Sequence, residues 1–434
     1  MVSDKIHCCA IDTEVLTFNG WKKASDLRMN DHIATLKDGK LVYDEPIDIM
    51  IYPDYEGSMY YIKNQAVDLA VTGNHRMWVS KFYRRNQTWK PYEFARADEI
   101  IGKHLKYKKD AIWENDDYQF VLPKVRLVDG SIIKEKNVVM NEWLTFIGIL
   151  YSQNSSPIFN DSKSEIVKFR FRDLDNDNYL LLNSLFKFGF DEEINSDEIF
   201  FFIYFLVFFI TSSLCDDIMV LVAMFLCFFA ITLSMNKSDV HFTLENNPQL
   251  YKYLKTLRFG TELPEWVLKL SKDQTRVLIK GMLLGNDEKN VYYTSSVNLA
   301  DQFQQLCLHA GWAGVVSTHL KSGERFIEIR GKEVVNKYDV LRISVVTKRM
   351  NPTVNQSCVN NVDEQEEERF IEKEKCPVFC LQVPSEVFYI RRNGKTCWTG
   401  NSRSQGHVTT LTRQPLEGRS RYVLFFIYLN CFSS

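Results

Sequence analysis

The sequence contains no CxxC pair among its ten cysteines. None of its eight histidines lies in an HExxH motif or in the Cys/His spacing of a zinc site. We therefore expect no structural metal and no cofactor. A secretory signal is also lacking at the start of the sequence, and the cysteines are scattered along it. These features predict an intracellular, reducing environment.

An excess of one sign of charge is lacking as well. The 53 Lys and Arg residues nearly balance the 55 Asp and Glu residues, which gives a net charge of -2 and a pI near 6.5. This balance provides no global basic field that would indicate a nucleic-acid partner. It does not exclude a local basic groove. With 434 residues, 45% of them hydrophobic, the chain can fill the cores of two or three domains.

Strand patterns dominate both ends of the sequence. From Met1 to about Lys124, short alternating runs are separated by turn dipeptides such as Asn19-Gly20 and Asp38-Gly39, which are strong hairpin signals. Residues 377–391 again have strand character and precede the turn dipeptide Asn393-Gly394. The acidic segment before them, from Asp363 to Lys375, is expected to be a solvated linker.

The middle of the sequence has helical periodicity instead. Residues 143–151 predict a compact apolar helix, and Ser271 to Gln274 form a capping box that opens another helix, expected to run to Gly285. Gly281 and Gly285 lie four residues apart on one face, where a second helix can approach closely. Strands at both ends with helices and strands between them indicate one domain interrupted by another.

Two apolar stretches do not fit this plan. Residues 200–235 are nearly all apolar around Asp216 and Asp217, and the 18 residues from 218 to 235 are long enough to raise the question of a membrane span. Residues 422–434 have a similar composition. We favour translated non-coding sequence, such as retained introns, for both. A membrane hairpin and a buried pair of core helices are the alternatives, and no stable membrane partner is expected.

The chemically distinctive residues lie close to the two ends. Asn401 can attack its own carbonyl through its side-chain amide, forming a succinimide and breaking the bond to Ser402, whose hydroxyl can capture an acyl group. Near the start, the sulfur of Cys8 can attack the carbonyl of His7 and convert the amide into a thioester. Taken singly, each feature has an ordinary alternative: a Gly-Asn-Ser turn and an unreactive thiol.

Two further residues have the chemistry that such a reaction needs. His75 can exchange protons near neutral pH and protonate the departing amide nitrogen. Thr72 can hydrogen-bond the scissile peptide and orient it. A satisfied surface or core histidine is the alternative for His75.

Together, the order and spacing of these residues resemble those of inteins, self-splicing elements with the Hint fold that Hedgehog-type autoprocessing domains share. By that resemblance, Cys8 makes the first acyl shift, Ser402 receives the amino-terminal segment, Asn401 cyclises, and the ester rearranges to an amide. The resemblance implies a mainly β, horseshoe-like Hint domain. It is carried by four blocks: Cys8-Cys9-Ala10-Ile11-Asp12-Thr13, Thr72-Gly73-Asn74-His75, Val378-Phe379-Cys380-Leu381-Gln382-Val383-Pro384 and Trp398-Thr399-Gly400-Asn401-Ser402.

Three positions depart from the family pattern. Gly400 occupies the penultimate position, which is commonly His, and Glu386 stands where the preceding block often has His. Cys380 occupies the position where many inteins have an Asp that assists several steps; a buried strand cysteine is the alternative. The resemblance therefore implies slower splicing or another assisting group.

The flanks resemble a different protein. Asp4 to His7 joined to Ser402 to Arg421 is similar to a segment of the second-largest subunit of DNA-directed RNA polymerase II. This resemblance implies action in cis on the flanks, host polymerase subunits as partners after splicing, and the nucleus or a virus-replication setting as the location.

The middle resembles a LAGLIDADG homing endonuclease domain, with motif-like helices at 146–154 and 278–287. In active relatives an acidic residue ends each helix and holds a divalent metal, whereas Gln153 and Asn286 stand here. Because neutral amides bind hard cations poorly, we expect nuclease activity to be lost. Lys168, Arg170 and Arg172 alternate along a strand-like run and could contact DNA, but a solvated sheet face explains them equally well.

We therefore predict a mainly β Hint domain that is interrupted by an inserted α/β LAGLIDADG-like domain. Three rivals remain: a site-specific homing DNA endonuclease, a membrane-associated protein, and cleavage without ligation. The last would not require Asn401 or Ser402. The expected segments are a polymerase flank (1–7), the first Hint part (8–130), the insert (131–350, including 200–235), an acidic linker (351–375), the second Hint part (376–401), a second polymerase flank (402–421) and the apolar tail (422–434).

Overall fold

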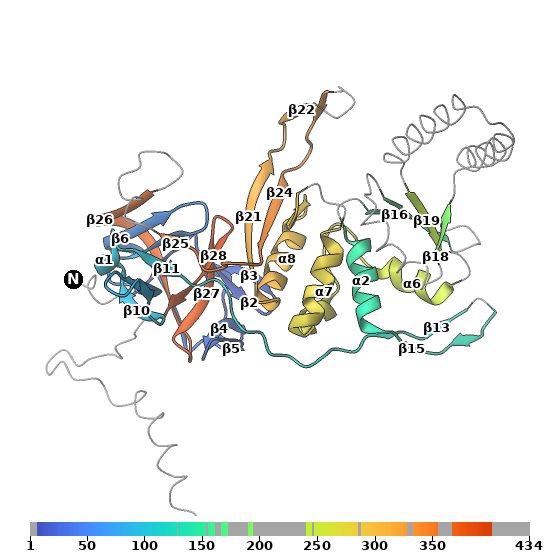
Figure 1. Cartoon of the computed structure of the whole chain (residues 1–434), viewed down its shortest axis with the longest axis horizontal. Coiled ribbons are helices and arrows are strands. Elements are labelled where there is room, and N and C mark those ends of the chain that lie inside the picture. The colour runs from blue at the N-terminus through green and yellow to red at the C-terminus, as the bar shows by residue number, and fades with distance from the viewer. Residues whose placement is uncertain are drawn as a thin grey trace, which may run out of the picture. The chain divides into compact units, whose positions relative to one another are not determined.

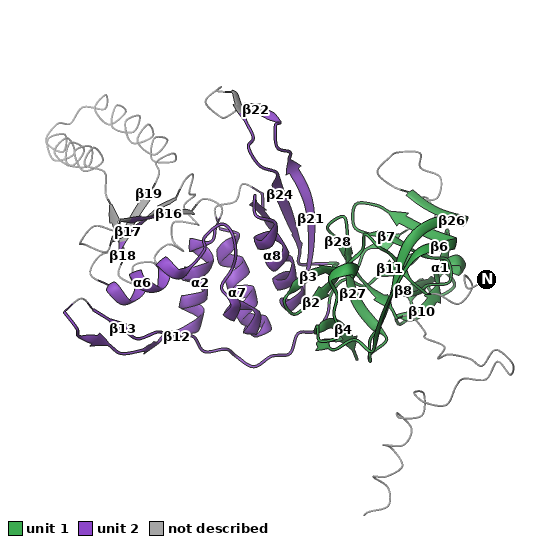
Figure 2. Ribbon diagram, turned by 180° about the vertical axis from the view of Figure 1, so that it is seen from behind, with its two compact units in different colours: residues 1–110, 349–434 green, residues 111–348 purple. Residues whose placement is uncertain are grey.

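The structure is a computed structural model that divides into two compact units (Figure 2). Unit 1 combines Met1–Asp110 with Arg349–Ser434, and unit 2 is Ala111–Lys348. The residues that the structure describes are 7–127, 129–152, 155–160, 166–171, 190–193, 240–244, 247–284, 288–327, 333–354 and 367–401.

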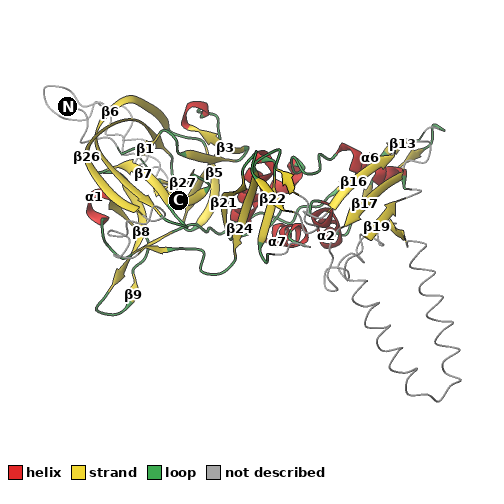
Figure 3. Cartoon of the chain, turned by 90° about the horizontal axis from the view of Figure 1, so that it is seen from above, coloured by secondary structure: helices red, strands yellow, loops and turns green. Residues whose placement is uncertain are grey.

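Unit 1 is mainly β (Figure 3). Its strands form a small closed barrel in the order β1-β26-β6-β7, a sheet in the order β10-β8-β11-β25 with β9 paired to β8, and a sheet in the order β28-β27-β2-β4-β5 with β3 paired to β2. The described elements are β1 (Cys9–Ala10), β2 (Glu14–Thr17), β3 (Gly20–Lys23), the 3-10 helix η2 (Ala24–Asp26), β4 (Ile33–Lys37), β5 (Lys40–Asp44), β6 (Asp48–Lys63), β7 (Asp68–Thr72), β8 (Arg76–Tyr83), β9 (Thr88–Trp89), β10 (Glu93–Arg96), α1 (Ala97–Ile100), β11 (Leu105–Tyr107), β25 (Thr353–Val354), β26 (Glu367–Gln382), β27 (Val387–Arg392) and β28 (Lys395–Gly400).

The two hairpins and the one turn predicted from turn dipeptides are confirmed. β2 and β3 pair with Thr17 opposite Gly20, which leaves only Phe18 and Asn19 in the turn. Asp38 and Gly39 both have positive φ (52° and 80°), as do Asn393 and Gly394 (47° and 75°). Two consecutive positive φ values match the twist of the flanking strands in a two-residue hairpin, which is why Asn-Gly and Asp-Gly are favoured there.

The first and the last described segments of the chain meet in the barrel of unit 1. β26 pairs with β6 from Glu367 opposite Lys63 to Gln382 opposite Asp48, and Figure 1 shows these strands side by side, one orange-red and one blue. β1 lies between β26 and β7. Strands from before residue 72 and after residue 366 therefore share one sheet and bury a common apolar cluster.

The acidic segment expected to be a linker is different in the structure. Residues 367–375 form the first half of β26. Charged side chains of this segment have partners on the neighbouring strand β6. Tyr60 Oη donates to Glu368 at 2.8 Å, Tyr61 Oη donates to Glu374 at 2.9 Å, and Lys373 forms an ion pair of 2.7 Å with Glu56. The local charge pattern of this segment favours exposure to solvent. It does not reveal strand pairing with residues that lie some three hundred positions away.

Unit 2 combines helices with short antiparallel sheets. Its sheets have the strand orders β16-β17-β19-β18 and β20-β24-β21, with pairs β12-β15, β13-β14 and β22-β23. The described elements are β12 (Val121–Leu122), β13 (Val125–Arg126), β14 (Ile132–Ile133), β15 (Lys136–Asn137), α2 (Met140–Leu150), β16 (Ser155–Asn160), β17 (Ile166–Phe171), β18 (Phe190–Glu193), β19 (Val240–Leu244), α6 (Pro248–Thr256), the 3-10 helix η3 (Glu265–Lys269), α7 (Lys272–Met282), β20 (Val291–Thr294), α8 (Val297–His309), β21 (Ala313–Leu320), β22 (Arg325–Ile327), β23 (Glu333–Val335) and β24 (Val340–Val346).

The two predicted helices of the middle segment are confirmed, and they pack against each other. α7 begins at the predicted capping box, in which Ser271 and Gln274 satisfy each other's backbone. α7 ends at Met282, before the expected Gly285. A Cβ on Gly148 of α2 would lie 2.7 Å from the Leu278 carbonyl oxygen and 2.8 Å from Gly281 Cα of α7. Glycine is therefore what permits this close approach.

Several predictions fall on residues outside the described parts of the chain. These are the apolar stretches 200–235 and 422–434, the positions Gln153 and Asn286, and the side chains of Arg170 and Arg172. None of the helices in the described residues has the length and apolar character that a membrane crossing requires. The LAGLIDADG resemblance of the insert stays a prediction.

Candidate functional site

Cys8 is placed at the site by the strand that follows it. Because β1 pairs with β7, Cys8 lies beside the end of β7, where its backbone N–H donates to Thr72 Oγ1 at 3.0 Å and its carbonyl accepts from Thr72 N at 3.0 Å. The Cys8 side chain is fully buried. Thr72 therefore hydrogen-bonds the nitrogen of the His7–Cys8 peptide bond, and its orienting role stays a prediction.

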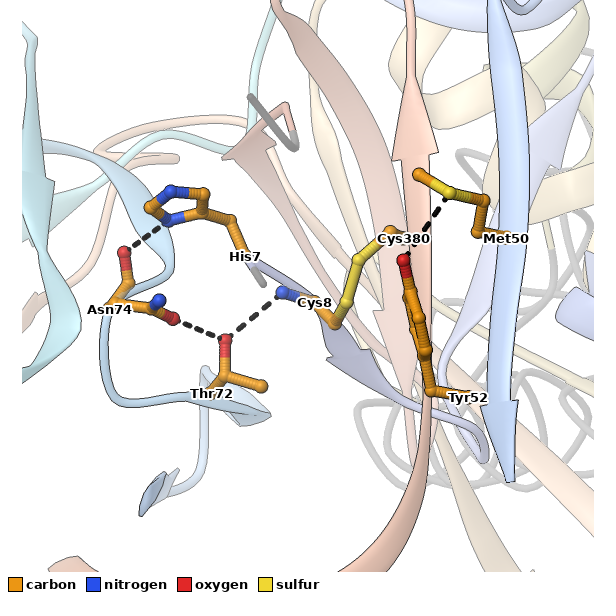
Figure 4. Close-up of a disulfide and its surroundings, with 7 residues drawn as sticks. All are labelled: His7, Cys8, Met50, Tyr52, Thr72, Asn74 and Cys380. Atoms are coloured by element: carbon orange, nitrogen blue, oxygen red, sulfur yellow. Dashed lines mark hydrogen bonds between the residues drawn. A yellow bond between two sulfur atoms is a disulfide. The ribbon is translucent and has the colours of Figure 1, made fainter. Parts of the chain in front are cut away.

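The turn after β7 continues this network (Figure 4). A hydrogen bond of 2.9 Å from His75 N to Thr72 O closes the turn. Inside it, the Thr72 hydroxyl donates to Asn74 Oδ1 at 2.9 Å, and the Asn74 carbonyl accepts from His7 Nδ1 at 2.6 Å. The Asn74 amide nitrogen, Nδ2, is buried and has no hydrogen-bond partner. The turn that bonds the nitrogen of the His7–Cys8 peptide through Thr72 thus also holds a buried amide donor without an acceptor.

The sulfur of Cys8 forms a disulfide with Cys380 of β26 (Figure 4). The register explains the pairing: Cys9 of β1 lies opposite Phe379, so Cys8 comes opposite Cys380, with a Cα–Cα distance of 4.5 Å. Tyr55, Met59 and Val378 bury the pair. In this oxidised form the Cys8 sulfur has no thiolate to offer as a nucleophile.

His75 follows the same turn and is 1% exposed. Burial lowers its pKa to about 3, as do the charges of His7 and Arg76, while the backbone of His7 next to the ring favours the protonated form. Its Nε2 is 2.8 Å from Thr399 Oγ1 of β28, and its Nδ1 has no hydrogen-bond partner. The imidazole is therefore neutral near pH 7.

Asn401 follows β28 and is 4% exposed. Its side chain forms two hydrogen bonds with the backbone of Val383: Nδ2 donates to the carbonyl at 2.9 Å, and Oδ1 accepts from the N–H at 3.0 Å. Its backbone N–H donates to the Glu386 carbonyl at 2.8 Å. The β27–β28 hairpin, in which Val387 lies opposite Gly400, holds these three residues together.

Five of the six predicted site residues are therefore described, and all five lie in unit 1. Cys8 contacts Thr72 and Cys380 directly, and His75 is linked through Thr399 to the strand that leads to Asn401. Ser402 lies outside the described residues. Within the described parts of the chain, no group of three or more His, Cys, Asp or Glu side chains could hold a metal ion.

Sequence reasoning missed three residues of this network. Asn74 and Thr399 lie inside the blocks singled out above, so their hydrogen-bonding side chains were a readable signal. Val383 acts through its backbone, which leaves no trace in the type of side chain.

Comparison with known proteins gives two curated relatives. The chain is 32% identical over 458 residues to "DNA-directed RNA polymerase subunit beta C-terminal section" of Stigeoclonium helveticum, covering 97% of this chain and 39% of that protein. It is 26% identical over 507 residues to "ATP-dependent Clp protease proteolytic subunit" of Chlamydomonas moewusii, covering 93% of this chain and 46% of that protein. The chain thus spans less than half the length of each relative.

Among solved structures, the chain is similar to a splice-inactive variant of the AceL NrdHF class 3 split intein. The identity is 16%, the TM-score is 0.18, and the match covers 30% of this chain and 76% of the intein. No protein-family model matches the chain.

Proposed function

We propose that the chain is an intein that excises residues Cys8 to Asn401 and joins His7 to Ser402. The observation that carries this proposal is the arrangement of Cys8, Thr72 and His75 around the His7–Cys8 bond, in the unit that also holds Asn401. Each group matches one requirement of the reaction: a nucleophile, an orienting hydrogen bond, a proton carrier and a cyclising amide.

The first step begins with reduction of the Cys8–Cys380 disulfide by a thiol reductant. The freed Cys8 thiol loses its proton to the neutral His75, and its sulfur attacks the His7 carbonyl carbon. The His7–Cys8 amide bond breaks, and the imidazolium returns the proton to the departing nitrogen. The unpartnered Asn74 Nδ2 is available for the oxygen anion of the tetrahedral intermediate.

In the later steps, the Ser402 hydroxyl oxygen attacks the Cys8 thioester carbonyl and takes the acyl group. The bond from that carbonyl to the Cys8 sulfur breaks, and Cys8 leaves as a thiol with the hydroxyl proton. Asn401 Nδ2 then leaves the Val383 carbonyl, attacks the Asn401 carbonyl carbon and releases Ser402 as an amine. That amine attacks the ester and forms the new amide. Cys380, whose sulfur adjoins Cys8, is proposed to assist as a thiol in place of the usual acidic residue.

The two curated relatives support the proposal that this chain contains an element inserted into different host proteins. Their names describe different activities, yet each matches more than nine-tenths of this chain. A segment common to a polymerase subunit and a protease subunit is what an insertion into both would produce. For this chain we propose an RNA polymerase host, with residues 1–7 and 402–421 as the flanks. The nuclear location, inferred from the polymerase II resemblance, stays a prediction.

Splicing is tested by expressing the full chain with a different tag on each flank, adding dithiothreitol and weighing the products. Intein activity yields a ligated product that carries both tags, together with a free piece from Cys8 to Asn401. The matched control is the double variant Cys8→Ala, Asn401→Ala, which should make neither cut. A wild-type chain that stays intact under reducing conditions, or one that is cut without ligation, contradicts the proposal.

A second candidate function is a homing endonuclease in unit 2. It is favoured by the glycine contact between α2 and α7, which resembles the helix packing expected of a LAGLIDADG domain. We propose a degenerate domain without nuclease activity because of Gln153 and Asn286. Magnesium-dependent nicking of DNA that spans the host insertion site by the wild-type chain would overturn this part of the proposal.

A further inference from the structure

The last residue of the proposed amino-terminal flank, His7, contacts the site through its side chain. Its Nδ1 lies 2.6 Å from the Asn74 carbonyl oxygen, and Figure 4 shows the ring directed at this oxygen. A carbonyl oxygen can only accept a hydrogen bond, so Nδ1 carries the hydrogen and donates it. The excised piece therefore binds a side chain of the host segment that it does not itself contain.

The same turn holds the other side of the scissile bond. Thr72 Oγ1 accepts the backbone N–H of Cys8 at 3.0 Å and donates to Asn74 Oδ1 at 2.9 Å. The His7–Cys8 peptide bond is thus held on its carbonyl side by the His7 ring and on its nitrogen side by Thr72. Fixing both residues in one orientation is what an intramolecular attack on the carbonyl carbon gains from most.

The turn that carries the accepting carbonyl is itself fixed by β6 and α1. The Gly73 N–H donates to the Ser58 carbonyl of β6 at 2.9 Å, and the Gly73 carbonyl accepts from the Asp98 N–H of α1 at 2.6 Å. Asn74 is 7% exposed. Because the acceptor cannot move towards a different partner, the flank side chain has to match it.

We propose that His7 is a specificity-determining residue of the splice site. The Asn74 carbonyl selects host segments whose last side chain has a nitrogen donor bonded to its Cγ, as His and Asn do. An aliphatic side chain at this position leaves the carbonyl without that partner. The inference rests on the proposed splicing function, and it concerns the first cut alone.

The test compares His7→Asn with His7→Leu in the tagged full chain under reducing conditions. Both variants lack the imidazole and its charge beside His75, but only Asn keeps a donor bonded to Cγ. Cleavage at the Cys8 thioester by added dithiothreitol is followed in an Asn401→Ala background, and a sample without thiol corrects for cyclisation of the new Asn. His7→Leu should slow this cut about tenfold, whereas His7→Asn should stay within about threefold of the parent.

Carboxyl-terminal cleavage in a Cys8→Ala background is the control for a general structural effect. It should stay within about twofold of the parent in both variants, because His7 and Asn401 share no contact in the proposed second cut. Equal slowing of the first cut by Leu and Asn overturns the inference. So does an unchanged first cut in His7→Leu, or a parallel loss of the second cut.

The hydrogen bond itself is measured without cleavage, by nitrogen NMR of the Cys8→Ala, Asn401→Ala chain labelled with ¹⁵N-histidine. The His7 ring should carry its hydrogen on Nδ1, in a signal that His7→Asn removes. A hydrogen on Nε2 alone overturns the inference whether or not the chain splices. If the Nδ1 hydrogen is present but the parent chain makes neither cut, the proposed function fails, and the role of His7 falls with it although the contact is real.

Discussion

The sulfur of Cys8 is bonded to the sulfur of Cys380, a residue 372 positions later in the chain. Since only a free Cys8 sulfur can attack the His7 carbonyl, the bond opposes the first step of the proposed reaction. We expect the oxidised chain to stay intact and to begin splicing when dithiothreitol is added. Mass spectrometry of the intact chain before and after reduction, followed by product analysis over time, checks both parts.

Cys380→Ser is the matched variant for this prediction. It leaves Cys8 without a partner, so the requirement for reductant should disappear even if the rate falls through loss of the assisting thiol. Splicing of the wild-type chain that proceeds equally fast with Cys8 oxidised would contradict the role assigned to Cys8.

Thr72 is expected to act on the amino-terminal cut alone. Thr72→Val removes the oxygen that accepts the Cys8 N–H and leaves that buried donor unpaired, so cleavage by added thiol should slow about 10- to 100-fold. Thr72→Ser keeps the oxygen and should stay close to wild type. Equal rates of thiol-induced cleavage for the valine and serine variants in the Asn401→Ala background would show that the Thr72 hydroxyl has no role in the first cut.

The side chain of Asn401 is expected to be needed only for the second cut. Asn401→Ala has no amide to cyclise and loses both hydrogen bonds to Val383, so carboxyl-terminal cleavage and ligation should stop. Thiol-induced release of the amino-terminal flank should persist, because Cys8, Thr72 and His75 are unchanged. Gel and mass analysis of each flank distinguishes these outcomes. Release of the carboxyl-terminal flank from this variant would show that another group cuts there.

His75 makes the stability of the chain depend on pH. Its pKa falls from the ordinary 6.5 to about 3 on folding, so the unfolded chain binds a proton there that the folded chain does not. The stabilisation is complete above pH 6.5 and is lost as the pH falls towards 3, by about 1.4 kcal/mol per pH unit. Denaturant unfolding of the Cys8→Ala, Asn401→Ala chain between about pH 7 and pH 4 measures this slope.

His75→Gln is the comparison for the pH experiment. In this variant, the slope of the free energy of unfolding against pH should be shallower by the contribution of one histidine. His309→Gln should remove a similar contribution, because burial also lowers the pKa of His309 to about 3. An unchanged slope in His75→Gln would mean that the imidazole is not neutral in the folded chain.

The local chemistry of the site could be predicted from the sequence, but the partners could not. The turns at Asp38-Gly39 and Asn393-Gly394 could each be predicted from two adjacent residues. Cys8 and Asn401 could be singled out because their own functional groups are reactive. The disulfide partner of Cys8 depends on the register of β1 against β26, which no local pattern fixes. The binding of the Asn401 amide by Val383 depends on backbone groups alone.

The close approach of α2 and α7 gives a last prediction, for unit 2. In an exposed helix, Gly→Ala is stabilising by up to about 1 kcal/mol. At Gly148 the new methyl group would instead press on the Leu278 carbonyl oxygen and Gly281 Cα, so Gly148→Ala should destabilise the chain by about 1–3 kcal/mol. Denaturant unfolding of the Cys8→Ala, Asn401→Ala chain measures the change, with Asn141→Ala on the exposed face of α2 as the control, expected within about 0.5 kcal/mol of its parent. A gain in stability from Gly148→Ala would show that the two helices are not in contact.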